Sequence, residues 1–270
     1  MTGNASVAAP YLTCRRERCR EMIVGSFPDN CSERSMISFT VDSDGADEMA
    51  ECFREFVRDP SFPCVGAKSA LSRDRMRIIV ARDLSSAWDD LRILPELVKL
   101  AADYAIEPAL FQTLVVIFGG PEDLTEAEFE SHLWNRVQSL TDKDDLWFSQ
   151  PRDARVSDDP DDPHFSLSFG GEAFFVVGLH PGASRLARRF ERPALVFNLH
   201  DQFEQLRARN QYEKLRGAIL DRDIALAGSI NPMLKRHGEG SEARQYSGRA
   251  VDDDWSCPYA GRGKGFDNDA

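Results

Sequence analysis

Apolar residues recur at helical spacing in four stretches of the chain, and this period predicts helices. The stretches are residues 45–58, 84–104, 126–140 and 202–221. The third carries a helix-start signal, because Thr125 followed by Glu128 can form a capping box. Pro95 interrupts the second stretch, and we expect it to kink or split that helix.

Short runs rich in β-branched and aromatic residues predict buried strands. They cover residues 76–81, 111–118, 164–169, 174–179 and 195–199. Gly170-Gly171 lies between two of these runs and is a hairpin signal, so a purely parallel sheet is not expected. The pattern predicts a single α+β domain, with a mixed sheet flanked by helices.

Both ends of the chain lack the apolar period of a core element. Residues 1–35 are polar and predict a flexible N-terminal arm, and residues 259–270 are rich in Gly and Asp and predict a disordered tail. The folded domain is therefore expected to span residues 36–258. Within it, residues 151–163 are rich in Asp, Pro and Arg and predict a loop.

The charge balance of the chain indicates which kinds of binding partner to expect. The 270 residues include 45 acidic and 33 basic side chains, for a net charge of -12. This balance argues against a nucleic-acid binder or an anionic-membrane binder, because both need a basic face, whereas it suits a cationic substrate. No apolar segment approaches the roughly 20 residues of a membrane span, and the start of the chain does not resemble a signal peptide. We therefore expect a cytoplasmic protein whose six cysteines are free thiols.

Two histidines each follow a predicted strand. His180 comes after the run 174–179 and His200 after the run 195–199. A histidine at a strand end can bind a metal, a heme iron or a substrate, or it can simply bond to backbone at a helix start. Arginines lie downstream at Arg185, Arg188, Arg189 and Arg207, and guanidinium groups bind carboxylates such as heme propionates. Alternatively, Arg188 and Arg189 lie on an ordinary solvated helix face.

Two further segments are candidates for chemistry. Cys64 follows a proline and precedes Gly66, so its thiolate could ligate a heme on a constrained loop, or the residue is a small buried one at a turn. Residues 241–249 are dense in hydrogen-bonding side chains and lack a core pattern. This segment predicts either part of a site or disorder. Glu242 within it would suit a cationic guanidinium, or it is plain surface charge.

These motifs together resemble the YqcI/YcgG family. The resemblance rests on Pro63 to Lys68, on Gly178 to Arg185, on Phe197-Asn198 with His200, and on Ser241 to Arg249 followed by Trp255 and Cys257-Pro258. It runs from about Phe53 to Pro258. Some members of this family are heme-dependent enzymes that hydroxylate a guanidino nitrogen. One branch makes Nω-hydroxy-L-arginine in D-cycloserine biosynthesis, and another hydroxylates a modified arginine on the way to guanitoxin.

The resemblance implies a heme b enzyme that N-hydroxylates L-arginine. Oxygen would come from O2 with an external electron donor or from H2O2, since the chain has no flavin or nicotinamide motif. His200 is the first candidate for the iron ligand, His180 the second and Cys64 the third. Whichever of the two histidines does not bind iron could act as a proton donor. The other expected heme contacts are Arg185, Arg249 and Tyr246, and the other expected catalytic residues are Glu242 and Arg244.

Other readings of the same residues remain open. One is a heme-binding sensor or carrier without turnover, and another is a hydroxylase of a different guanidino compound. A third is a non-heme metal hydrolase that uses His180, His200, Asp201 and Glu204, although the sequence offers no compact ligand motif for it.

Overall fold

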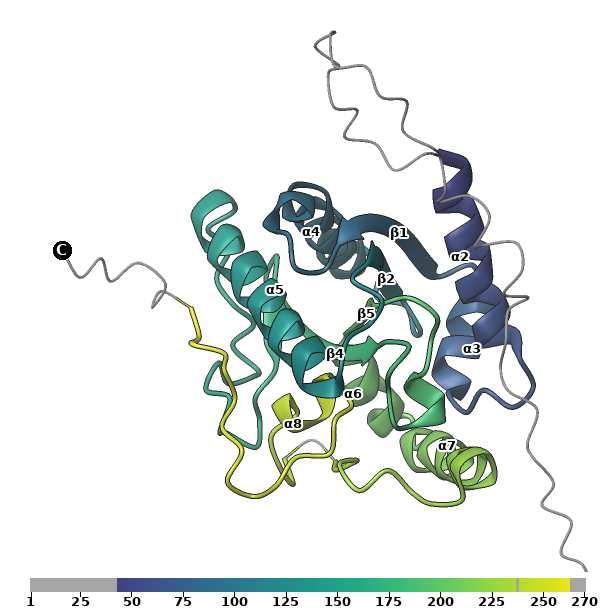
Figure 1. The fold of residues 1–270 in the computed structure, drawn as a ribbon. Helices are drawn as coiled ribbons and strands as arrows, with labels where there is room; N and C mark the ends of the chain where they lie inside the picture. The colour runs from purple at the N-terminus through teal and green to yellow at the C-terminus, as the bar shows by residue number, and fades with distance from the viewer. Residues whose placement is uncertain (1–42, 237, 263–270) are drawn as a thin grey trace, which may run out of the picture.

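A five-stranded sheet forms the centre of the molecule, with helices on both of its faces (Figure 1). The computed structural model describes residues 43–236 and 238–262. The strands are β1 (Met76–Asp83), β2 (Thr113–Gly120), β3 (Leu167–Phe169), β4 (Glu172–Leu179) and β5 (Ala194–Leu199), in the spatial order β1-β2-β5-β4-β3. The β1–β2 pair is parallel and the other pairs are antiparallel. The mixed sheet and flanking helices confirm the α+β prediction.

The helices alternate with the strands along the chain. They are α2 (Ser43–Arg58), α3 (Val65–Ser72), α4 (Asp90–Ile106), α5 (Glu126–Trp147), α6 (Asp201–Ala208), α7 (Tyr212–Ala227) and the one-turn α8 (Ala243–Tyr246), with 3-10 turns η1 (Ala87–Asp89) and η2 (Leu186–Arg188). No helix in the described part of the chain has both the length and the apolar character that crossing a membrane requires.

Two local predictions are confirmed in detail. The Thr125 side chain accepts from the backbone of Glu128, and the Glu128 carboxylate accepts from the backbone of Thr125, so α5 begins with a capping box. Gly170 and Gly171 join β3 to β4 with φ of 59° and 87°. Both angles lie in the left-handed region, which glycine adopts without a steric penalty.

The two faces of the sheet are covered to different extents. On the face against α4 and α5, strand residues such as Val116, Phe174 and Phe197 have no exposed surface. The opposite face packs against α2 and α3 over β1 and β2. Towards β4 and β5, alternate strand residues on this second face are only half-buried, and we call them the sheet patch: Phe175, Val177, Val196 and Asn198. Protein therefore fills the space above this part of the sheet only partly.

Several element boundaries differ from the predictions. The second helix starts at Asp90 and continues through Pro95 without splitting, because a proline in the second turn removes only one backbone hydrogen bond. The last long helix breaks between α6 and α7, where Asn210 takes a φ of 54°. The short helix α3 was not predicted, because it carries too few apolar positions to show a period.

The ordered packing continues beyond Pro258. Tyr259 is buried, and its hydroxyl lies 3.3 Å from the Thr141 hydroxyl of α5. Arg262 pairs with Asp144 at 2.6 Å. The prediction that a disordered tail begins at residue 259 is therefore wrong for residues 259–262. The predicted arm, residues 1–35, and the rest of the predicted tail lie outside the described residues.

Candidate functional site

The two strand-end histidines lie at opposite ends of the sheet. Strands β4 and β5 run antiparallel, with Leu179 opposite Ala194, so His180 follows β4 next to the start of β5. His200 follows β5 next to the start of β4, and its backbone N donates to the Ala173 carbonyl at 2.8 Å. The register places His180 opposite Pro193, so the two histidines lie roughly 23 Å apart along the strand direction. The expectation that one could ligate an iron while the other donates a proton to the same centre is therefore wrong.

His180 is packed in the core rather than presented to a ligand. It is 1% exposed, and its ring stacks on Phe129 of α5 with centroids 4.3 Å apart. Burial lowers the pKa of His180 to about 4, so the ring is neutral at pH 7. A Cβ at Gly182 would lie 3.4 Å from Nδ1, which shows how closely the following loop approaches this nitrogen. The surroundings favour a structural role for His180.

His200 has a carboxylate partner. The residue is 5% exposed at the corner between β5 and α6, and its Nε2 lies 3.3 Å from Oε1 of Glu242. Phe203 of α6 lies next to it, with ring centroids 6.2 Å apart. The same Phe203 ring is 6.2 Å from that of Phe175, so His200 borders the sheet patch.

Glu242 joins His200 to two hydroxyl groups. Its Oε2 lies 3.2 Å from the Ser166 hydroxyl and 3.4 Å from the Tyr246 hydroxyl, and both hydroxyls also lie close to the Phe174 carbonyl. Burial, together with the charge of Glu242, raises the pKa of Tyr246 well above its usual value. The structure thus brings three of the candidate residues, His200, Glu242 and Tyr246, together in one buried cluster. Ser166 was missed, because a lone serine in a strand-like run carries no signal.

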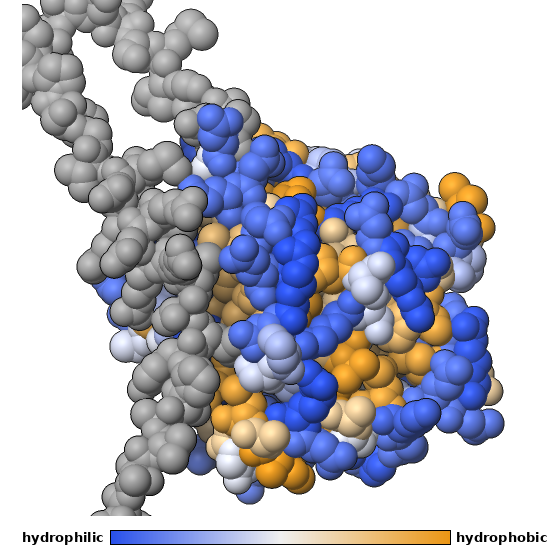
Figure 2. All heavy atoms as spheres, turned by 90° about the vertical axis from the view of Figure 1, so that its right-hand side faces the viewer, coloured by the Kyte–Doolittle hydropathy of each residue, from blue (hydrophilic) through white to orange (hydrophobic). Residues whose placement is uncertain are grey.

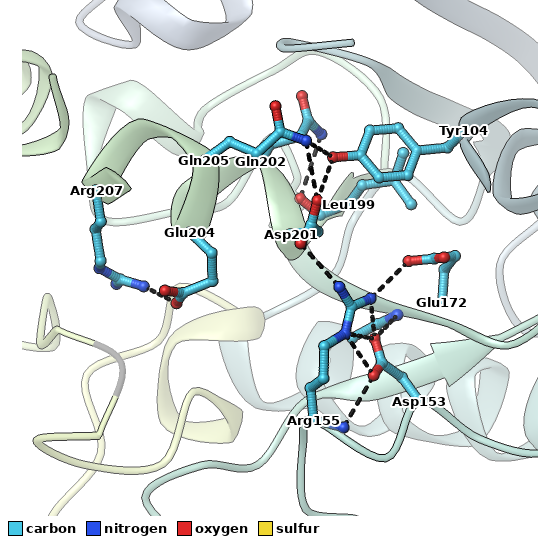
Figure 3. A network of polar contacts seen from close by, with 11 residues as sticks. Tyr104, Asp153, Arg155, Glu172, Leu199, Asp201, Gln202, Glu204, Gln205 and Arg207 are labelled. Carbon is cyan, nitrogen blue, oxygen red and sulfur yellow. Dashed lines mark hydrogen bonds and ion pairs between the residues drawn. The ribbon is translucent and has the colours of Figure 1, made fainter. Parts of the chain in front are cut away.

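A second polar network holds the corner that carries His200. Arg155 pairs with Asp153, Glu172 and Asp201 at 2.6, 2.9 and 2.8 Å, and Figure 3 shows its guanidinium pointing into the group of three carboxylates. Asp201 directly follows His200 and also accepts from the Tyr104 hydroxyl at 2.7 Å. The network ties loop 151–163 to the start of β4 and the start of α6. Sequence reasoning missed it, because Arg155 lies in a stretch that predicts only a loop.

The candidate arginines are distributed over separate parts of the fold. Arg185 pairs with Asp223 of α7 at 2.5 Å. Arg249 donates through Nε and Nη2 to Glu130 of α5, at 2.9 and 2.6 Å. Arg244 donates to the carbonyls of three residues in the C-terminal segment: Asp252, Asp253 and Trp255. Arg244 and Arg249 therefore tie the C-terminal segment to the fold and do not join the cluster around His200.

Cys64 lies at the N-terminus of α3. Its Sγ accepts from the backbone N of Ala67 at 3.4 Å. Burial raises the pKa of the thiol, while the backbone N–H groups of Ala67 and Gly66 oppose this shift. The residue is still partly accessible and packs against the same core cluster as Val177 and Val196 of the sheet patch. On the side of the molecule that carries α2, α3 and α7, apolar surface is visible between polar side chains (Figure 2).

The metal-hydrolase reading finds no support in this arrangement. In residues 43–236 and 238–262, no group of three or more His, Cys, Asp or Glu side chains could hold a metal ion. The separation of His180 from His200 explains why. The described cysteines, Cys52, Cys64 and Cys257, are free thiols as expected, and Cys14, Cys19 and Cys31 lie outside the described residues.

Two curated proteins of Bacillus subtilis (strain 168) are similar to this chain. Uncharacterized protein YcgG is 27% identical over 217 residues, which cover 74% of this chain and 81% of the relative. Uncharacterized protein YqcI is also 27% identical, over 216 residues that cover 75% and 82%. No solved structure matches.

A family model supports the same relationship. The model of the YqcI/YcgG family matches residues 53–260, which include β1 to β5, Cys64, both strand-end histidines and the segment 241–249. The match also includes Tyr259, in agreement with its packing against α5. The chain belongs to the YqcI/YcgG family.

Proposed function

We propose that this protein binds heme b and hydroxylates a guanidino nitrogen of L-arginine, which yields Nω-hydroxy-L-arginine. The proposal extends the resemblance described above, which also assigns the reaction to antibiotic biosynthesis of the D-cycloserine type. The observation that carries it is the buried His200–Glu242 pair beside the sheet patch. A histidine that binds a metal usually donates its other ring N–H to a carboxylate or carbonyl, which fixes the ring and makes it a stronger ligand.

The surrounding residues fit a heme. The sheet patch offers half-buried apolar side chains, such as Val177 and Val196, to a flat apolar ring. His200 would hold the iron. Arg185, which the resemblance assigns to the heme, lies in the loop before β5 and pairs with Asp223 of α7. Cys64 borders the same face of the sheet and is the alternative ligand. When bound, heme supplies the activation of O2 or H2O2, which no side chain of the protein provides.

The residues around His200 have positioning roles in this proposal. Glu242 orients the imidazole, and the hydroxyls of Ser166 and Tyr246 hold the carboxylate. Because the Glu242 carboxylate already contacts His200 and the two hydroxyls, we assign it to orienting His200 rather than to binding the substrate guanidinium. Arg155 and Asp201 fix the backbone on either side of the corner.

The proposal is tested by absorption spectra of the heme-reconstituted protein, ferric and ferrous-CO, with and without L-arginine. We expect an imidazole-type CO band and an arginine-dependent shift. His200→Ala should lose this band, whereas His164→Ala, which changes an exposed histidine, should keep it. Glu242→Gln should keep the band and weaken heme binding by about tenfold, the usual cost of removing such a carboxylate.

Three outcomes would change the reading. A thiolate-type band that is lost in Cys64→Ser would move the ligand to Cys64. Heme binding that does not respond to arginine or to any other guanidine would favour a sensor or carrier. A wild-type protein that takes up no heme would end the proposal.

A further inference from the structure

Four cationic side chains gather where α3, α7 and the turn η2 meet. They are Lys68 of α3, Arg222 of α7, and Arg185 and Arg188 from the segment between β4 and β5. In the described part of the chain, two carboxylates act on them: Asp223, which pairs with Arg185 and also attracts Arg188, and Asp59, whose charge opposes the lowering of the Lys68 pKa. Such an excess of positive charge is unexpected in a protein of net charge -12.

Arg188 is held by backbone carbonyls of two separate segments. Its guanidinium donates to three backbone carbonyls, those of Gly178, Gln245 and Tyr246, at 2.8 to 3.0 Å. Among residues 43–236 and 238–262, no carboxylate lies at ion-pair distance from it, although the charge of Asp223 acts on it, and its three hydrogen bonds use Nη1 and Nη2 and leave Nε–H unused. Burial lowers the pKa of Arg188 to about 10, which shows a strongly desolvated charge. A desolvated cation held only by neutral carbonyls is costly, and an anion nearby would offset this cost.

Lys68 and Arg222, the other two cations, also donate to backbone carbonyls rather than to carboxylates. Lys68 donates to the Asp59 carbonyl at 2.5 Å, and Arg222 donates to the carbonyls of Pro60 and Phe62. Burial and then the charge of Arg222 lower the pKa of Lys68. The Nε of Arg222 is buried and unpaired among the described residues. Both pairs of cations thus donate to backbone carbonyls, and the four cations share the two carboxylates Asp59 and Asp223.

We propose that Arg188, which bonds to Gly178 of β4 next to Val177 of the sheet patch and whose charge acts on Cys64, binds a carboxylate of the ligand, with Lys68 and Arg222 adding to the attraction. Guanidinium groups bind carboxylates through two parallel hydrogen bonds, and the unused Nε–H of Arg188 is available for one of them. The inference rests on the proposed function for the identity of the ligand. Two sources share this chemistry: a heme propionate and the α-carboxylate of the amino-acid substrate.

A first experiment needs no heme and uses Cys64 as the reporter. The full-length apoprotein is treated with iodoacetate, which carries a carboxylate, or with the neutral iodoacetamide, and alkylation of Cys64 is followed by peptide mass spectrometry. The rate ratio of the two reagents cancels any change in thiolate fraction. We expect Arg188→Gln to lower the iodoacetate-to-iodoacetamide ratio about five- to tenfold, the effect of one nearby charge in a partly desolvated site.

The controls separate charge from general disruption. Arg189→Gln removes the adjacent guanidinium, which bonds to the Ala183 carbonyl, and should leave the ratio unchanged. Arg188→Lys keeps the charge and should retain most of the ratio even if Arg188→Gln folds poorly. An equal ratio in wild type, Arg188→Lys and Arg188→Gln would overturn the inference, whether or not the protein binds heme.

A second experiment identifies the source of the carboxylate, with apoprotein reconstituted with either heme and with heme-loaded protein for the substrate. Heme dimethyl ester lacks the propionate charges, and agmatine lacks the α-carboxylate of arginine. Weaker binding of the ester, by about tenfold in wild type but not in Arg188→Gln, would assign Arg188 to a propionate, and the same pattern for agmatine would assign it to the substrate. If both analogues bind as tightly as their parent compounds, Arg188 binds neither carboxylate and the inference is wrong.

Discussion

At the scale of single residues, His180 links the stability of the fold to pH. Its pKa is lowered from 6.5 to about 4 in the folded protein, because burial disfavours the charged ring. Between these two values the unfolded chain binds a proton that the folded chain does not. Stability due to this residue is therefore full above pH 6.5 and is lost as the pH falls towards 4.

Replacing His180 by phenylalanine should remove this dependence. The stack on Phe129 is kept, and Nδ1, which has no hydrogen-bond partner among the described residues, is removed. Comparing urea unfolding at pH 7 and pH 5, we expect the wild type to lose about 1 to 2 kcal/mol more than the variant, since each pKa unit corresponds to about 1.4 kcal/mol. His164→Ala should behave as the wild type. An equal loss in wild type and His180→Phe would show that His180 titrates normally.

At the scale of elements, the contact between β4 and α5 depends on a missing side chain. A Cβ at Gly178 would lie 2.6 Å from Cε1 of Phe129 and 2.9 Å from Cδ1 of Leu133. The side chains of Phe129 and Leu133 are both fully buried, so neither can move freely to make room for a Cβ. Gly178 thus lets the helix approach the strand whose end carries His180.

Gly178→Ala should therefore destabilise the protein by about 1 to 3 kcal/mol, the usual cost of overpacking a core. Gly217 in α7 provides the matched control, because nothing lies within 4 Å of a Cβ at that position. Gly217→Ala should stabilise the protein by about 0.5 to 1 kcal/mol, since alanine restricts the unfolded chain and favours a helix. Denaturant unfolding of both variants measures the two effects. Similar shifts of the same sign would contradict this account of the contact.

Helices and turns were predicted correctly where a few neighbouring residues determine the backbone conformation. The capping box at Thr125 and the left-handed glycines of the hairpin act within a few residues, so the sequence shows them directly. The break at Asn210 is less visible, because asparagine takes a positive φ only when the tertiary packing of α6 and α7 favours it. Helix α3 is short, and packing rather than an apolar period stabilises it.

At the scale of the whole molecule, the direction of the strands decides which predicted residues meet. The runs before His180 and His200 look alike in the sequence, but β4 and β5 are antiparallel, so the two histidines lie far apart. The segment with Glu242 was recognised as dense in polar groups, whereas its contact with His200 depends on where α8 docks beside β4. Sequence therefore singled out several residues of this polar cluster but could not say which of the candidates lie together.

The C-terminal segment also acts at this scale, because it joins α5 to the β3–β4 hairpin. Arg262 pairs with the buried Asp144 at 2.6 Å and donates to the Ser168 carbonyl at 2.6 Å. Asp144 in turn accepts from the backbone of Gly170 in the hairpin. Burial raises the pKa of Asp144 although Arg262 lowers it, so burying the charged carboxylate costs more than the arginine returns.

Removing Arg262 leaves the Asp144 charge buried, and breaking a buried pair in this way costs about 3 to 5 kcal/mol. We therefore expect Arg262→Met to lower the free energy of unfolding by about this amount at pH 7. The double variant with Asp144→Asn should recover most of the loss, because the amide keeps the bond to Gly170 without a charge. Urea unfolding of both single variants and the double variant gives the coupling energy directly. If the two losses simply add, Arg262 contributes through its other contacts, such as the bond to the Ser168 carbonyl, and the segment is not held to α5 through the charge of Asp144.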